Sequence, residues 1–121
     1  MTPRCPSINA IIDATEDTFG LSRGTLSMSK RRTAKPLFAR SVAAYLLREL
    51  RGMSWPEIAP QLCLRAHSTV GRLIEVATDR YEADEPFLIG GVETGYRQIV
   101  AAVRDRAWYL TMDRLPREVS A

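Results

Sequence analysis

The chain has 121 residues, 45% of them hydrophobic, which suits a single domain with a sizeable core. No apolar run approaches a transmembrane length, and the first residues lack the hydrophobic segment of a signal peptide, so we expect a cytoplasmic protein. The net charge is +3, but residues 1–78 hold 11 Lys or Arg against 6 Asp or Glu, whereas residues 79–121 hold 6 against 8. The basic front favours a polyanionic partner.

The first predicted helix runs from about Ile8 to Phe19, with Ser7 as its N-cap and Gly20 as its left-handed stop. Its apolar residues recur on one face, which predicts that this face packs on a core. Residues 21–28 are a connector, in which we expect Leu26 or Met28 to be buried.

A dense positive run follows in residues 29–35, which contain Lys30, Arg31, Arg32 and Lys35. Such a run is usually a solvated surface. Here it lies in a loop shortly before a helix-turn-helix pattern, and a basic arm in that position can follow phosphates or enter the minor groove of DNA. We therefore favour a DNA-binding arm.

A long scaffold helix is predicted from Pro36 to about Arg51, where Gly52 ends it. Tyr45 is expected at the edge of the core, and Arg40 and Arg48 are expected to point outward.

Residues 54–75 carry the pattern on which the functional interpretation depends. Ser54 and Glu57 form a capping box at the start of one helix. Residues 63–66 turn the chain, and a second helix begins with the polar run His67-Ser68-Thr69. Its later apolar positions have the i, i+3, i+4, i+7 spacing of one helical face. This layout is typical of a helix-turn-helix that reads DNA with the N-terminal end of its second helix.

The remaining residues predict a bend and one more helix. Residues 79–91 are acidic and contain Pro86 and the Gly90-Gly91 pair, which indicates a break. Helical spacing returns from Val92 to Leu110, and residues 111–121 are expected to fray. The last helix could fold back on the domain or mediate a homodimer. No strand-like alternation is found, so the predicted fold class is all-α, a compact helical domain with an extra C-terminal helix.

Catalytic and metal chemistry is not expected. The Gly90-Gly91 pair is not a nucleotide-binding loop, and His67 has no carboxylate or nucleophile at a motif spacing. Cys5 and Cys63 lack metal-ligand spacing. We therefore predict a protein that is not an enzyme and needs no nucleotide, metal or other cofactor.

The ordered set Lys30-Arg31-Arg32, Arg48-Glu49-Leu50, Ser54-x-Pro56-Glu57-Ile58 and His67-Ser68-Thr69-Val70 resembles the C-terminal DNA-binding domain of the bacterial replication initiator DnaA. The resemblance covers roughly residues 8–80. It implies a DNA-binding domain over residues 1–80, followed by an acidic linker and an extra helix over residues 81–121.

The resemblance also implies roles for single residues on double-stranded DNA. Arg32 would enter the minor groove, and the motif at His67, Ser68 and Thr69 would contact base edges in the major groove. Arg40 and Arg65 would lie near the DNA backbone or base edges. We expect further backbone contacts from Lys30, Arg31, Lys35 and Arg72.

Two stretches depart from the family pattern. The family usually has Gly-Gly-Arg-Asp before the histidine, whereas this chain has Cys63-Leu64-Arg65-Ala66. Ala66 therefore lacks the carboxylate that would accept from a cytosine amino group. Phe38 stands in place of an arginine at the start of the scaffold helix.

The function that these observations predict is sequence-specific binding of duplex DNA at DnaA boxes by a stand-alone domain without an ATPase. We expect it to be associated with the nucleoid. It could act in replication initiation or its control at an origin, regulate transcription, or serve a phage or mobile element. The alternative is a protein-interaction module that kept the fold and lost its DNA specificity.

Overall fold

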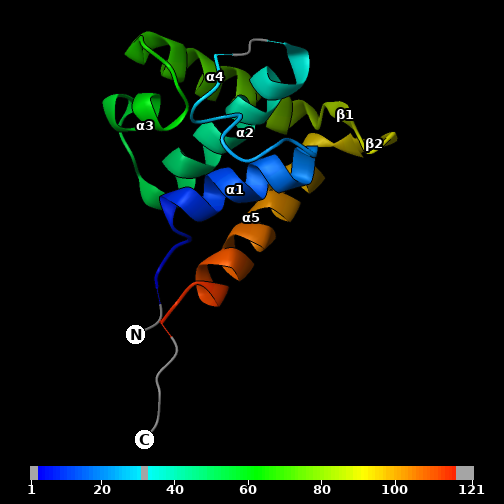
Figure 1. Ribbon diagram of the computed structural model, residues 1–121. Coiled ribbons are helices and arrows are strands. Elements are labelled where there is room, and N and C mark those ends of the chain that lie inside the picture. Colours follow the sequence, from blue (N-terminus) through cyan, green and yellow to red (C-terminus); the bar gives the residue numbers. More distant parts are fainter. Residues whose placement is uncertain (1–2, 31–32, 117–121) are drawn as a thin grey trace, which may run out of the picture.

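The computed structural model describes residues 3–30 and 33–116. In this part of the chain the elements are α1 (Ile8–Phe19), α2 (Ala34–Arg51), α3 (Trp55–Gln61), α4 (His67–Ala83), β1 (Pro86–Ile89), β2 (Val92–Gly95) and α5 (Tyr96–Asp113). Figure 1 shows α2 in the middle, with α3 to its left, α4 above it, and α1 and α5 below it. The predicted helical fold with a helix-turn-helix is confirmed. No helix among these elements is long and apolar enough to cross a membrane.

Capping residues explain both ends of the first helix. Ser7 Oγ accepts a hydrogen bond from the Ala10 amide at 3.2 Å, and Gly20, with a φ of 66°, ends α1. Both bounds of α1 are as predicted. Helix α2 begins at Ala34, two residues before the predicted start. Pro36 is still accommodated, because the missing N–H lies in the first turn, where no intrahelical bond is made.

An aromatic cluster closes the core beside α2. The Phe38 ring stacks on Phe87 with 4.1 Å between centroids, and it meets Tyr96 edge-on at 5.4 Å. Phe38 is buried, so the residue that departs from the family pattern serves packing. In the preceding connector, Leu26 is buried and Met28 is exposed.

Helix α5 folds back along α1 (Figure 1). Its buried residues are Tyr96, Ile99, Val100, Val103, Ala107, Leu110 and Thr111. Thr111 Oγ1 also accepts from the Ser7 amide at 3.0 Å, and Arg114 pairs with Asp13 at 2.8 Å. The apolar face that could have mediated a homodimer is therefore packed within the chain.

The hairpin β1–β2 was not predicted from the sequence. Strand β1 pairs antiparallel with β2, with Phe87 opposite Thr94 and Ile89 opposite Val92. Gly90 and Gly91 form its turn with φ values of 57° and 79°, a conformation that favours glycine at both central positions of a tight hairpin. The predicted helix from Val92 was therefore wrong in its first four residues, which form β2.

Candidate nucleic-acid interface

The helix-turn-helix consists of α3, the turn at residues 62–66, and α4. Ser54 Oγ accepts from the Glu57 amide at 3.4 Å, and Glu57 Oε1 accepts from the Ser54 amide at 3.0 Å. The predicted capping box at the start of α3 is therefore confirmed. The Ser54 hydroxyl also donates to Glu57 Oε1 at 2.8 Å. The donors from the Ser54 amide and hydroxyl favour the charged carboxylate, so they lower the pKa of Glu57.

The turn is anchored by two buried leucines. Leu62 and Leu64 are buried, and the Leu64 amide donates to the Ala59 carbonyl oxygen at 2.9 Å. Between them Cys63 has a φ of 55°, in the left-handed region that disfavours side chains with a Cβ atom. Cys63 therefore keeps a backbone conformation suited to glycine, the residue that the resembled pattern has there.

The first turn of α4 presents its polar residues to solvent. His67, Ser68 and Thr69 are exposed, whereas Val70 is buried and fixes the rotation of the helix. Ala66 is the N-cap, and its side chain makes no cap hydrogen bond. The Thr69 amide donates to the Ala66 carbonyl oxygen at 3.1 Å. The amides that precede it at this helix start are therefore the ones open to an anionic group, which the helix dipole favours.

Two residues of the basic arm, one on each side of residues 31–32, lie beside this helix start. Lys30, just before the arm's centre, lines the same surface hollow as Arg65 and Thr69. Ala34, just after it, lines a second hollow with Thr69 and Arg72. Both ends of the arm therefore border the first turn of α4. Arg31 and Arg32 lie outside the described residues.

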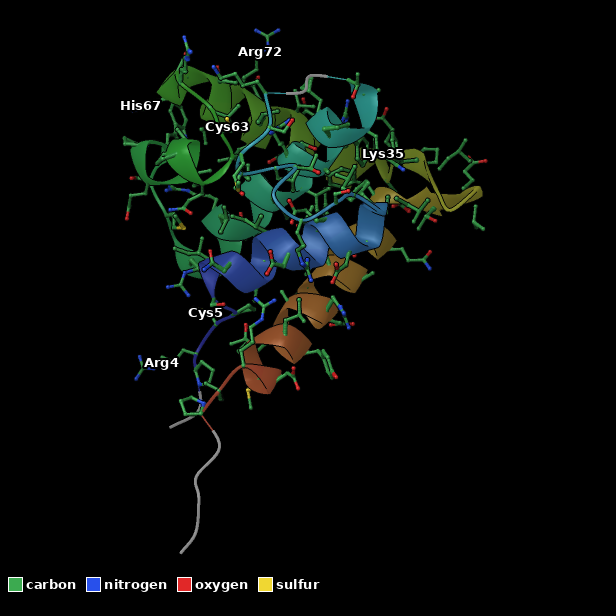
Figure 2. All side chains as sticks on the ribbon, viewed as in Figure 1. Arg4, Cys5, Lys35, Cys63, His67 and Arg72 are labelled. Carbon is green, nitrogen blue, oxygen red and sulfur yellow. The ribbon has the colours of Figure 1, made fainter. Side chains whose placement is uncertain are left out.

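Charge separates this surface from the opposite one. Lys30, Lys35, Arg65 and Arg72 are exposed, and none of them lies within 4.0 Å of a carboxylate in residues 3–30 and 33–116. Figure 2 shows His67 and Arg72 at the α4 end of the molecule, far from Arg4 and Cys5.

On the opposite surface several exposed arginines are paired with carboxylates. Arg23 and Arg106 pair with Asp17 at 2.9 and 3.2 Å. These carboxylates neutralise part of the positive charge there, whereas the four cations named near α4 have no such partner in the described part of the chain.

Arg40 requires a correction. It was predicted to point outward and to contact the DNA backbone, but it is 0% exposed. Its Nε donates to the Leu62 carbonyl oxygen at 3.1 Å, and its Nη2 donates to the carbonyl oxygens of Thr25 and Ser29. Arg40 therefore lies under the interface, where it ties the loop before the basic arm to the turn before α4.

Glu16 holds the same loop from the side of α1. It is buried, and its Oε2 accepts from the Leu26 amide at 3.0 Å. Its Oε1 is buried without a hydrogen-bond donor among the described residues. Burial raises the pKa of this carboxyl above its ordinary value, because the charged form loses its hydration.

One residue of this surface was missed in the sequence. Trp55 is 46% exposed and lines a hollow on α4 together with Ser68, Thr69, Arg72 and Glu75. The signal that could have found it is Gly71, an isolated glycine within a helical pattern, which often marks a close packing contact.

The exposed helix start, its uncapped amides and the adjacent unpaired cations define a helix-turn-helix DNA-binding domain. Comparison with known proteins identifies the family. Residues 8–76 match the family described as the bacterial dnaA protein helix-turn-helix. The chain belongs to this family, and its helix-turn-helix is a DNA-binding rather than a catalytic domain.

A curated relative agrees with this assignment. The chain is 42% identical over 59 residues to the chromosomal replication initiator protein DnaA of Aliarcobacter butzleri (strain RM4018). The aligned part covers 49% of this chain but only 14% of that relative, so the chain spans a small part of the protein it matches. No solved structure matches the chain.

Proposed function

We propose that this chain binds double-stranded DNA at sites of the DnaA-box type, in replication initiation control or transcription regulation. The DNA-binding unit would be residues 1–80, and residues 81–121 would complete its core through α5. The observation that carries the proposal is the position of Thr69. It lies at the start of α4, and it lines hollows with both flanks of the basic arm and with Trp55.

The chemistry of this surface suits two adjacent grooves. The hydroxyl groups of Ser68 and Thr69, the Thr69 methyl group and the His67 imidazole suit polar base edges and thymine methyl groups in the major groove. Arg32, in the basic arm, would enter the minor groove. An arm and a recognition helix that share a border can reach neighbouring grooves of one duplex.

The exposed cations would position the duplex. Lys30, Lys35, Arg65 and Arg72, together with Arg31, would contact phosphates that flank the two grooves. The open amides at the start of α4 would add one further anion contact. We do not assign a DNA contact to Arg40, because it is buried.

The preferred sequence would differ from that of family members with Gly-Gly-Arg-Asp before the histidine. Ala66 is exposed and has no polar side-chain atom, so it cannot accept from a cytosine amino group. The base pair that the aspartate would read should therefore be read weakly or not at all.

Selection of binding sites from randomised duplex DNA tests the proposal. Enrichment of a short asymmetric motif of the DnaA-box type, with relaxed preference at one position, is the expected result. A protein-interaction module that lost DNA specificity would enrich no motif, and it would leave DNA unbound at about 50–100 mM salt, where phosphate contacts still register.

A further inference from the structure

Trp55 belongs to α3, but its indole ring packs against α4. A Cβ atom at Gly71 would lie 2.6 Å from Cη2 and 2.7 Å from Cζ2 of the Trp55 indole. The ring therefore lies against the backbone of α4, at a distance that any side chain at position 71 would prevent. Even so, Trp55 remains 46% exposed.

The glycine is required for space rather than for backbone conformation. Gly71 lies inside α4 and is absent from the residues with positive φ in the described part of the chain. Glycine within a helix costs roughly 1 kcal/mol relative to alanine. The room it leaves for the indole is the feature that a larger residue would remove.

The indole lies on the outward side of α4. Residues Ser68, Gly71, Arg72 and Glu75 have the i, i+3, i+4, i+7 spacing of one helical face, and they line one hollow with Trp55. Position 71 is the member of this face without a side chain, and the indole of α3 fills that place. The outward face that would enter the major groove therefore includes an aromatic surface.

We propose that Trp55 is a specificity-determining residue that contacts the 5-methyl group of a thymine in the major groove. This inference rests on the proposed duplex binding. The thymine methyl is the apolar group that base edges present in that groove, and an exposed indole beside two hydroxyl-bearing side chains suits it. Because the absence of a side chain at Gly71 leaves room for the indole, the contact with thymine depends on both Trp55 and Gly71.

The test replaces each thymine of the preferred duplex by deoxyuridine, which lacks the methyl group, and measures affinity by fluorescence anisotropy. For the wild-type full chain, one position should lose affinity about fourfold, the equivalent of roughly 0.8 kcal/mol for one buried apolar carbon. In Trp55→Ala the same replacement should cause no further loss. A thymine read by Thr69 should remain sensitive in that variant, which makes it an internal control.

Gly71→Ala provides an independent variant. It leaves Trp55 in the chain and favours the helix, but it displaces the indole, so its uridine profile should match that of Trp55→Ala. It also carries the test if Trp55→Ala does not fold. Trp55→Phe, with a smaller ring, should keep part of the effect.

The outcomes separate this inference from the proposed function. Absence of duplex binding by the wild-type chain would overturn both. Duplex binding with the same uridine profile in all variants would overturn the role of Trp55 alone and leave it a packing residue.

Discussion

The Nε atom of Arg40 donates to the carbonyl oxygen of Leu62 at 3.1 Å, so a buried guanidinium in the centre of α2 reaches the turn that delivers α4. The same side chain donates to the Thr25 carbonyl oxygen at 3.0 Å and to that of Ser29, the first residue of the basic arm. One buried side chain therefore connects the start of the basic arm to the turn before α4.

Loss of the Arg40 side chain should destabilise the fold. Arg40→Ala should lower the free energy of unfolding by about 3 kcal/mol, because it leaves buried carbonyl groups without their charged donor. Arg48 is the matched control, since it is an exposed arginine on the same helix whose Nη1 donates to the Met53 carbonyl oxygen at 3.0 Å. Its alanine variant should lose about 1 kcal/mol or less. Chemical denaturation measures the free energy of unfolding of both variants. Equal losses would contradict the larger contribution to stability that we assign to the buried hydrogen bonds of Arg40.

Cys63 is expected to be a site of backbone strain. Its φ of 55° should make Cys63→Gly more stable by about 0.5–1 kcal/mol, the relief of the left-handed conformation less the entropy that glycine adds to the unfolded chain. Cys63→Ala keeps the Cβ atom and should bring no such gain. Thermal unfolding of the two variants decides the point, and stabilisation by alanine as well would assign the effect to the thiol.

The charge of Lys30 should appear in the salt dependence of DNA binding. If Lys30 contacts one phosphate, Lys30→Ala should reduce the slope of log K against log salt by about 0.9. Arg104 is exposed on α5 beside Asp105, so Arg104→Ala removes a charge away from the interface. It should leave the slope unchanged. The same decrease in both variants would show that general charge, and not position, drives binding.

Glu16 should make stability depend on pH. Its pKa in the folded chain is raised above the ordinary value of 4.5 by burial, so the folded state binds a proton more readily than the unfolded state. The favourable contribution of the protonated carboxyl is complete below about pH 4.5 and is lost as the pH rises through the raised pKa.

Glu16→Gln isolates this effect. Glutamine can still accept from the Leu26 amide but does not titrate, so wild-type stability should decline relative to the variant as the pH rises through that window. Denaturation series at several pH values measure the difference. A constant difference between the two proteins would contradict the raised pKa.

The local signals of the sequence were sufficient for much of the fold. Ser7 and Gly20 define α1 because each supplies a specific cap, and the Ser54–Glu57 box defines the start of α3. The hairpin could not be predicted in the same way. Its strands have only four residues each, and Phe87 joins them to the core through a ring contact with Phe38, distant in sequence.

The exposed residues of the candidate site could be predicted from the sequence, but the buried arginine beneath them could not. His67, Ser68 and Thr69 follow from the polar start of an apolar helix, and they are exposed. Arg40 was misjudged because a charge on a helix suggests solvent. It shares the i, i+3, i+7 spacing with the buried residues Ala43 and Leu47, but its partners are carbonyl groups of loops, which no spacing reveals.

The most direct test of the account compares two threonines on one helix. Thr69 is exposed in the first turn of α4, whereas Thr78 is exposed nine residues later, and its Oγ1 donates to the Ile74 carbonyl oxygen at 2.9 Å. Anisotropy titrations of Thr69→Ala and Thr78→Ala would use the selected duplex and a scrambled duplex, with thermal unfolding to verify the folds. We predict that Thr69→Ala loses about tenfold in affinity for the selected site, within the roughly 1–3 kcal/mol of a base contact, with little change on scrambled DNA. Thr78→Ala should match the wild type on both. Equal losses in the two variants, or a Thr69→Ala loss of the same size on both duplexes, would contradict base recognition by the start of α4.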